Sequence, residues 1–132
     1  MAVKLASLLP STQVWPFTDG ALYQVYAAPG CVTVVSLQPG EELVTVAAGD
    51  TVRWIVGDTS SGSGDALRVN VLVKPIRSGL KTNLVITTSR RTYLLELTST
   101  ERAWMASVSW DYPKDRMLAL QRQAQAASAA AP

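Results

Sequence analysis

The chain has 132 residues, of which 48% are hydrophobic and 17% are charged, and its formal net charge is +2. This length suits one domain, and the balance of apolar and charged residues is typical of a globular protein rather than a disordered one. The weak net charge gives no electrostatic reason to expect binding to nucleic acid or to a membrane surface.

The residues at the start of the chain, 1–20, are punctuated by prolines and a glycine and are expected to form an extended arm. No run of about 18 apolar residues, the length of a membrane-spanning helix, occurs in the chain. The short apolar run within this arm is too short for a signal peptide. Trp15 and Phe17 are the arm's large apolar side chains. Because Trp15 falls outside the regular strand pattern, it can either pin the arm to its own domain or insert into a neighbouring protein. Both possibilities stay open.

From residue 21 onward, short apolar and β-branched runs recur about every ten residues and are separated by turn dipeptides such as Pro29-Gly30 and Pro39-Gly40. This spacing predicts an all-β domain over 21–113, folded as an antiparallel β-sandwich. The expected strands are residues 22–26, 32–37, 42–46, 51–56, 67–74, 82–88, 92–98 and 103–110.

Alternation along these runs predicts which side chains are buried. Tyr93, Leu95 and Leu97 share one face of their strand, and Trp104 and Trp110 share a face of the last strand that we expect to lie in the core.

The segment 58–65, DTSSGSGD, predicts a long polar loop with a mobile tip between two antiparallel strands. Its glycines could cradle a phosphate, but the lysine and the following Ser or Thr of a P-loop are missing, so a plain hairpin loop is favoured.

The end of the chain, 114–132, reads KDRMLALQRQAQAASAAAP and predicts a helical, Ala-rich linker. Met117, Leu120 and Ala124 fall on one face at helical spacing. The stripe is thin, so such a helix is marginal on its own.

The residues needed for catalysis or for metal binding are scarce. The chain has no histidine and a single cysteine, which removes the commonest general base and metal ligand and excludes a disulfide within the chain. Cys31 lies in the run CVTVVSL, so we expect a buried, unreactive thiol in a strand. Glu41 and Glu42 are paired carboxylates in a turn, with no partner group in view. We therefore expect no enzyme, no catalytic residue, no metal and no cofactor.

Several basic residues lie near predicted turns. If they meet at one end of the sheet, they form a basic rim that could contact nucleic acid or a protein partner. Tyr93, the nearby aromatic, is expected to point inward, so a protein interface or a solvated edge is favoured over direct nucleic-acid binding. The candidate interface residues, including the two aromatics of the arm, are Trp15, Phe17, Arg77, Lys81, Arg90 and Arg91.

Six segments carry a resemblance to a known family. In chain order they read LYQVYAAPG, VTVVSLQPGEEL, GDTVRWIVGD, TNLVITT, RRTYLLEL and WMASVSWDYP. In this order and spacing they resemble the TrbG-type conjugative transfer proteins, which are related to CagX and to the VirB core components of type IV secretion systems. The resemblance covers most of the chain.

The resemblance implies a structural subunit in the periplasm of a Gram-negative cell, in the inner layer of the envelope-spanning core complex. The implied partners are a TrbI-like core subunit and neighbouring copies in a ring. It also implies that this chain is an N-terminal half whose export signal is removed or lies upstream. The full-length protein is expected at the outer membrane, where it would meet a small lipoprotein only through the C-terminal domain missing here.

Two other functions stay open at this point. A basic-rimmed β-domain could contact single-stranded DNA, and its affinity would then depend on salt. A sandwich that binds carbohydrate or peptidoglycan would show exposed aromatic side chains on one sheet face.

Overall fold

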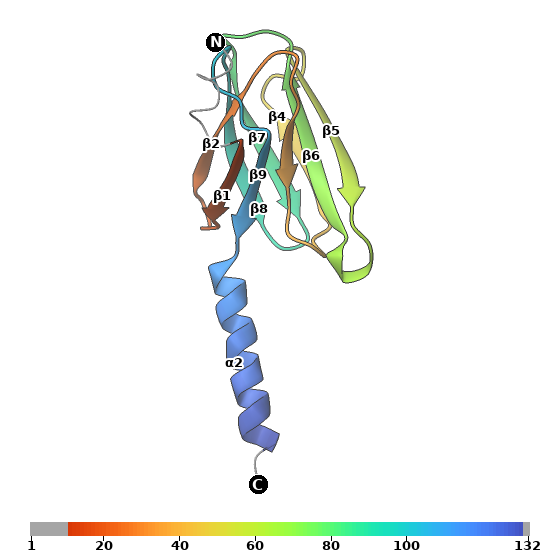
Figure 1. The fold of residues 1–132 in the computed structure, drawn as a ribbon, viewed down its shortest axis with the longest axis vertical. Helices are drawn as coiled ribbons and strands as arrows, with labels where there is room; N and C mark the ends of the chain where they lie inside the picture. Colours follow the sequence, from red (N-terminus) through yellow and green to blue (C-terminus); the bar gives the residue numbers. More distant parts are fainter. Residues whose placement is uncertain (1–10, 131–132) are drawn as a thin grey trace.

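Alternating apolar residues build two β-sheets, and one long helix continues from the last strand (Figure 1). The computed structural model describes residues 11–130, so the first ten residues of the predicted arm and the last two of the linker lie outside the described residues. The strands are β1 (Thr12–Pro16), β2 (Leu22–Ala27), β3 (Thr33–Ser36), β4 (Leu43–Ala48), β5 (Trp54–Ser61), β6 (Arg68–Pro75), β7 (Lys81–Thr88), β8 (Thr92–Ser99) and β9 (Ser107–Asp111). The helices are the short 3-10 helix η1 (Gly64–Ala66) and the α-helix α2 (Pro113–Ala130).

The strands form a five-stranded sheet in the order β1-β9-β3-β6-β5 and a four-stranded sheet in the order β2-β8-β7-β4. The predicted all-β sandwich is confirmed. Both sheets are mixed, however, because β1 and β3 run parallel to β9 and β2 runs parallel to β8. The chain crosses between the sheets at most connections, so many hydrogen-bonded neighbours are distant in sequence and no hairpin fixes their direction. The prediction of purely antiparallel sheets was wrong in this respect.

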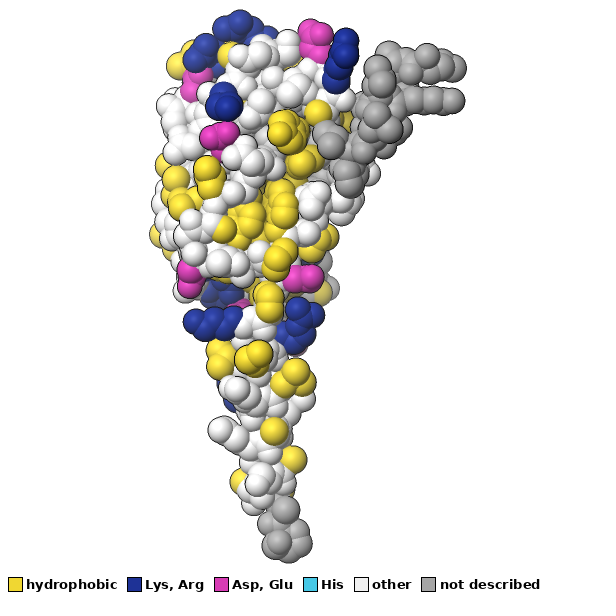
Figure 2. Space-filling model, turned by 90° about the vertical axis from the view of Figure 1, so that its left-hand side faces the viewer, with side chains coloured by type: hydrophobic (Ala, Val, Ile, Leu, Met, Phe, Trp, Pro, Cys, Tyr) yellow, Lys and Arg dark blue, Asp and Glu magenta, His cyan; other side chains and the backbone are white. Residues whose placement is uncertain are grey.

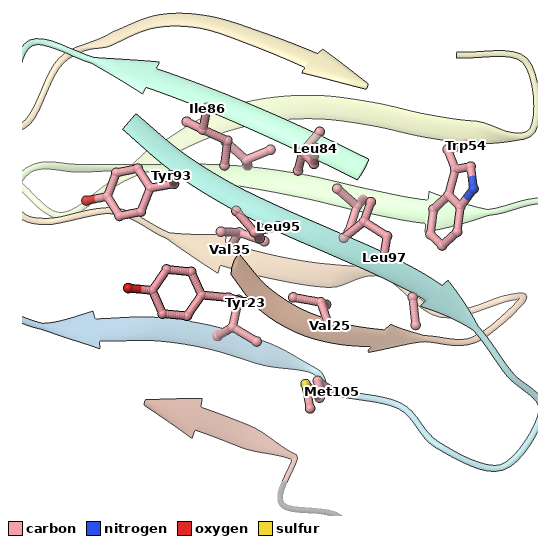
Figure 3. Packing of buried hydrophobic residues seen from close by; sticks show 14 of the residues in the cluster. Tyr23, Val25, Val35, Trp54, Leu84, Ile86, Tyr93, Leu95, Leu97 and Met105 are labelled. Atoms are coloured by element: carbon pink, nitrogen blue, oxygen red, sulfur yellow. The ribbon is translucent and has the colours of Figure 1, made fainter. Parts of the chain in front are cut away.

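The core lies between the two sheets and follows the predicted alternation. Tyr93, Leu95 and Leu97 of β8 are fully buried, and Leu84 and Ile86 of the neighbouring strand β7 lie beside them on the same face of the sheet. Figure 3 shows these side chains stacked in the layer between the sheets. The period-two pattern of β8 therefore identified its buried face correctly.

The predicted arm contains a strand. Residues 12–16 form β1, an edge strand whose Trp15 pairs in register with Trp110 of β9. Pro16 ends this strand at the edge of the sheet, where a missing backbone N–H is tolerated. The prediction that Trp15 falls outside the sheet pattern was wrong, because the sequence TQVWP does not alternate between polar and apolar residues although burial along β1 does.

The last strand begins four residues later than predicted. Met105 is buried and Trp104 is only partly buried. Trp104 was predicted to point into the core, so before Ser107 the inward and outward positions are the reverse of those predicted. The backbone N–H of Met105 donates to the carbonyl of Tyr26 at 2.9 Å, and that of Ala106 donates to the carbonyl of Ser11 at 2.8 Å. This irregular crossing from one sheet to the other shifts the phase of the alternation. Trp104 is therefore not part of the core.

Two further local predictions were wrong. Residues 58–61 do not belong to a loop but extend β5, where Ser61 pairs with Arg68 of β6. The remaining loop is tight, since a Cβ on Gly62 would come within 2.4 Å of the carbonyl oxygen of Ala66. Cys31 lies in the turn before β3, not in the strand, and is partly exposed rather than buried.

The predicted helix at the end of the chain is confirmed as α2, which begins at Pro113 and projects away from the sandwich (Figure 1). A proline suits the first helical position because its missing N–H has no partner there in any case. No residue of α2 is buried. In the described part of the chain, no helix is long and apolar enough to cross a membrane.

We predict that the buried tryptophans contribute strongly to stability and that Trp104 does not. Trp110 and Trp54 are 5% and 2% exposed, so Trp110→Ala and Trp54→Ala should each lower the free energy of unfolding by about 3–5 kcal/mol. Trp104→Ala is the control and should cost much less. Urea unfolding of the three variants measures this, and equal losses at all three positions would contradict the assignment of the core.

Candidate protein-interaction site

The predicted basic rim is not formed. Arg77 lies in the loop before β7 and Lys81 is the first residue of that strand, whereas Arg90 and Arg91 follow its end. An eight-residue strand separates the two pairs by about 23 Å. Figure 2 accordingly shows Lys and Arg side chains at the far end of the sandwich and again where the helix leaves it.

Arg91 lies at the centre of a polar cluster at the helix end of the sandwich. Its guanidinium contacts Glu41 Oε1 at 3.3 Å and Asp115 Oδ2 at 2.8 Å, and its side chain is only 8% exposed. The Glu41 side chain has no exposed surface. We call Arg91, Glu41, Tyr93, Tyr112 and Asp115 the Arg91 clasp.

Glu41 has a complete set of hydrogen-bond donors. Its Oε1 accepts from the Tyr93 hydroxyl at 2.7 Å and from the backbone N–H of Gln38 at 3.1 Å, and its Oε2 accepts from Thr88. A buried carboxylate is stable only when it is paired and hydrogen-bonded in this way.

Tyr93 is also fully satisfied. Its single proton goes to Glu41, so it accepts from Arg91 Nη1 at 3.2 Å, and the 2.9 Å contact with Tyr112 requires the Tyr112 hydroxyl to donate. The clasp thus links four parts of the chain: the turns before β4 and β8, strand β8, and the start of α2.

Local structure places each member of the clasp. The side-chain hydroxyl of Thr88 accepts from the backbone N–H groups of Arg90 and Arg91, both at 3.1 Å, which holds the tight turn between β7 and β8. Gly40, at φ +84°, allows the turn that presents Glu41. Asp115 lies in the first turn of α2, where a carboxylate also complements the helix dipole.

The two aromatic side chains of the predicted arm pack onto this domain. Phe17 and Tyr112 lie on the Arg91 guanidinium, with ring centroids at 5.2 and 4.2 Å. Trp15 contacts Tyr23 and Trp110, with centroids at 5.2 and 5.7 Å. In this structure, therefore, both arm aromatics pin the arm to its own sandwich.

The clasp shifts the protonation equilibria of its members. Burial alone lowers the pKa of Arg91, but the hydrogen bond with Tyr93 and the charges of Glu41 and Asp115 outweigh it, so the pKa lies above its usual range. Burial, followed by the hydrogen bond with Tyr112, raises the pKa of Tyr93 far above its ordinary value. Burial also raises the pKa of Tyr112.

The sequence model of the CagX family, described as conjugal transfer protein, matches residues 10–131, which include the whole sandwich and the clasp. The chain belongs to the CagX family. It is also 42% identical over 91 residues to the probable conjugal transfer protein TrbG of Sinorhizobium fredii (strain NBRC 101917 / NGR234). That match covers 69% of this chain and 34% of the relative, so the chain spans about a third of the length of the curated relative it matches.

The predicted resemblance to TrbG and CagX proteins is therefore confirmed. The interface role of the six predicted residues stays a prediction. Of these residues, the structure brings together Phe17, Arg90 and Arg91, which line an open hollow of about 450 Å³ beside the first turn of α2.

Sequence reasoning missed Glu41, Tyr112 and Asp115 as members of this CagX-family site. Their hydrogen bonds to Arg91 and Tyr93 join positions that are 19 to 52 residues apart in the sequence, and no local pattern reveals such pairs. One signal in the sequence could have pointed to the site. The charged Arg91 precedes the inward-facing Tyr93 by two positions, so both side chains are expected on the same side of the chain.

We predict that removing Arg91 is costly. Arg91→Met leaves the Glu41 carboxylate buried without its cation, so the free energy of unfolding should fall by about 3–5 kcal/mol. Arg90→Met is the matched control, because Arg90 is exposed in the same turn, and its guanidinium donates to the neutral Gln38 side chain and the Pro39 carbonyl and forms no ion pair among the described residues. Urea unfolding decides the matter. Similar stabilities for the two variants would show that the clasp contributes little.

We also predict a loss of stability at alkaline pH. The phenols of Tyr93 and Tyr112 have raised pKa values in the folded protein, whereas in the unfolded chain they ionise near pH 10. Their contribution is therefore present below about pH 10 and is lost as the pH rises above it. In Tyr93→Phe, the decline above pH 10 should become shallower by about 1.4 kcal/mol per pH unit. Urea unfolding at several pH values measures both slopes, and an unchanged slope would refute the assignment.

Proposed function

We propose that this chain is a structural subunit of a conjugative type IV secretion system, in the periplasmic inner layer of its envelope-spanning core complex. The proposed partners are a TrbI-like core subunit and neighbouring copies in a ring. The longer protein would reach the outer membrane, and there a small lipoprotein, through a further domain. The action is scaffolding, without turnover or cofactor.

The observation that carries the proposal, beside family membership, is the rigid joint between the sandwich and α2. A helix of 18 residues extends about 27 Å. Its first turn is bound to the sandwich by Asp115, which accepts from Arg91 at 2.8 Å and from Gln38 at 3.0 Å. A rigid module with a spacer in a fixed direction suits a part that sets distances in a large assembly.

The two other functions find less support. The basic residues are divided between opposite ends of the sandwich, and Tyr93, the aromatic residue near Arg90 and Arg91, is buried in the clasp and cannot stack on a base. Single-stranded DNA binding needs cations and stacking aromatics along one groove.

All nine aromatic residues lie in the described part of the chain and none is classed as exposed, so neither sheet offers the aromatic platform of a carbohydrate-binding face.

The proposal predicts assembly that depends on the remainder of the apparatus. In cells carrying the complete transfer region, the tagged full-length protein should co-purify with the TrbI-like subunit in a high-order complex. The 132-residue chain alone should be monomeric or only weakly self-associating at micromolar concentration, because a free module lacks the effective concentration that tethering provides.

Light scattering on both preparations tests these expectations. A full-length protein that stays monomeric with all partners present would refute the scaffold role. A tight ring formed by the 132-residue chain alone would refute the dependence on tethering.

A further inference from the structure

A row of apolar side chains crosses the outer face of the four-stranded sheet. Strand register places Leu22 beside Leu94, Leu94 beside Val85, and Val85 beside Ala47, so one residue comes from each strand. Their sequence neighbours point inward to the core, so these four point outward. We call Leu22, Leu94, Val85 and Ala47 the cross-strand row.

In the described part of the chain, the cross-strand row lies at the surface and has polar borders. Leu22 is 53% exposed, Ala47 is exposed, and the other two members are partly exposed. The next positions along the strands are polar or charged on one side and threonines on the other. On the first side these are Gln24, Glu96 and Asn83, and on the second they are Thr92, Thr87 and Thr45. An apolar band with a polar rim is the composition of an interface.

The helix α2 carries a second unpartnered apolar surface. Met117 and Leu120 are 61% and 59% exposed, and Ala124 and Ala127 continue the same face at helical spacing. We call these four residues the helix stripe. It is about 15 Å long at 1.5 Å per residue. The cross-strand row spans three strand spacings, about 14 Å, so the two surfaces match in length.

We propose that the helix stripe of one copy lies across the cross-strand row of the next copy. The helix cannot reach the row of its own sandwich, because the Arg91 clasp holds α2 pointing away from both sheets (Figure 1). The occupant is therefore a second copy of this chain. This inference rests on the proposed scaffold function and specifies its contact between copies.

Charge favours the same pairing. Lys114, Arg116 and Arg122 of α2 form no ion pair within the described part of the chain. Asp19 and Glu42 lie just before β2 and β4, at the helix end of the four-stranded sheet, and are likewise without an ion pair among the described residues. Arg90 lies at the same border, so a neighbour's basic helix would meet two carboxylates and one exposed cation there.

The contact is heterologous, because each copy contributes a helix stripe on one side and a cross-strand row on the other. Repeated contacts of this kind close into a ring or continue as a filament. One short helix on one sheet buries less than the roughly 800 Å² per partner of a standard stable interface. The contact is accordingly weak between two free copies and is stabilised when every copy makes two.

Thiol crosslinking in cells that carry the transfer apparatus tests the inference. In a Cys31→Ser background of the full-length protein, co-expressed Leu94→Cys and Leu120→Cys chains should be joined by a short bismaleimide. A chain with both substitutions should give a ladder of multimers. The control pairs Leu120→Cys with Ile55→Cys, which is 54% exposed on the outer face of the other sheet, and should crosslink at least tenfold less.

Charge substitution provides a second arm with matched exposure. Leu22→Glu, at a position 53% exposed, should lower the yield of the Leu94–Leu120 adduct at least tenfold, whereas Ile55→Glu should leave it unchanged. Both variants should keep the wild-type melting temperature, since neither side chain belongs to the core. Equal yields in the two variants would overturn the inference.

The outcomes separate this inference from the scaffold proposal. High-order complexes with no Leu94–Leu120 adduct would overturn the docking of the helix and leave the scaffold standing. Adducts between two Leu94→Cys chains, or between Leu94→Cys and another component, would likewise overturn the docking of the helix. So would an adduct that forms only after residues 2–10 are removed, because the cross-strand row would then be the docking site of those residues. Failure to form any complex would overturn both.

Discussion

The buried carboxylate of Glu41 is the constraint on which this end of the molecule depends. A carboxylate without exposed surface is unstable in a protein interior unless a cation and several donors satisfy it. Arg91 supplies the charge, and Tyr93 and Thr88 supply hydroxyl donors. All three groups belong to the β7–β8 hairpin and its turn, whereas Glu41 lies in the turn between β3 and β4, so the carboxylate is satisfied only when that turn is correctly placed against the hairpin.

The same cluster determines how the helix leaves the sandwich. A helix with no buried residue gains little from packing, and one of this length is marginal by propensity alone. Asp115 ties the first turn of α2 to Arg91, and the ring of Tyr112, next to the helix start, lies on the guanidinium. The Phe17 ring of the arm also lies against that guanidinium, with its centroid at 5.2 Å. The direction of α2 is thus fixed by one buried cation rather than by an apolar helix face.

The sequence predicted those features that arise from local patterns. Alternation identified the buried face of β8, and turn dipeptides separated the strands correctly because each is a short-range signal. Parallel pairing of β2 with β8 could not be predicted, since the partners are about 70 residues apart and no hairpin links them. Near Trp104 the inward and outward positions are exchanged because the chain crosses from one sheet to the other. A period-two pattern in the sequence does not reveal such a crossing. The clasp was missed for the same reason: its charges meet only after both sheets form.

The cross-strand row and the helix stripe are apolar surfaces that the core does not account for. Leu22 and Leu94 lie in register on the outer face of the four-stranded sheet, so two apolar side chains are adjacent at the surface rather than one alone. On an edge strand such as β2, an exposed leucine also invites nonspecific association, a cost that natural sheets usually avoid with charges. Retaining an apolar row there is consistent with a surface that is covered in the assembled state. The projecting helix has the complementary need, because its stripe gains stability only from a surface outside its own chain. One contact between copies would satisfy both requirements, and the clasp, by keeping α2 away from its own sheets, would leave each surface free to find its neighbour.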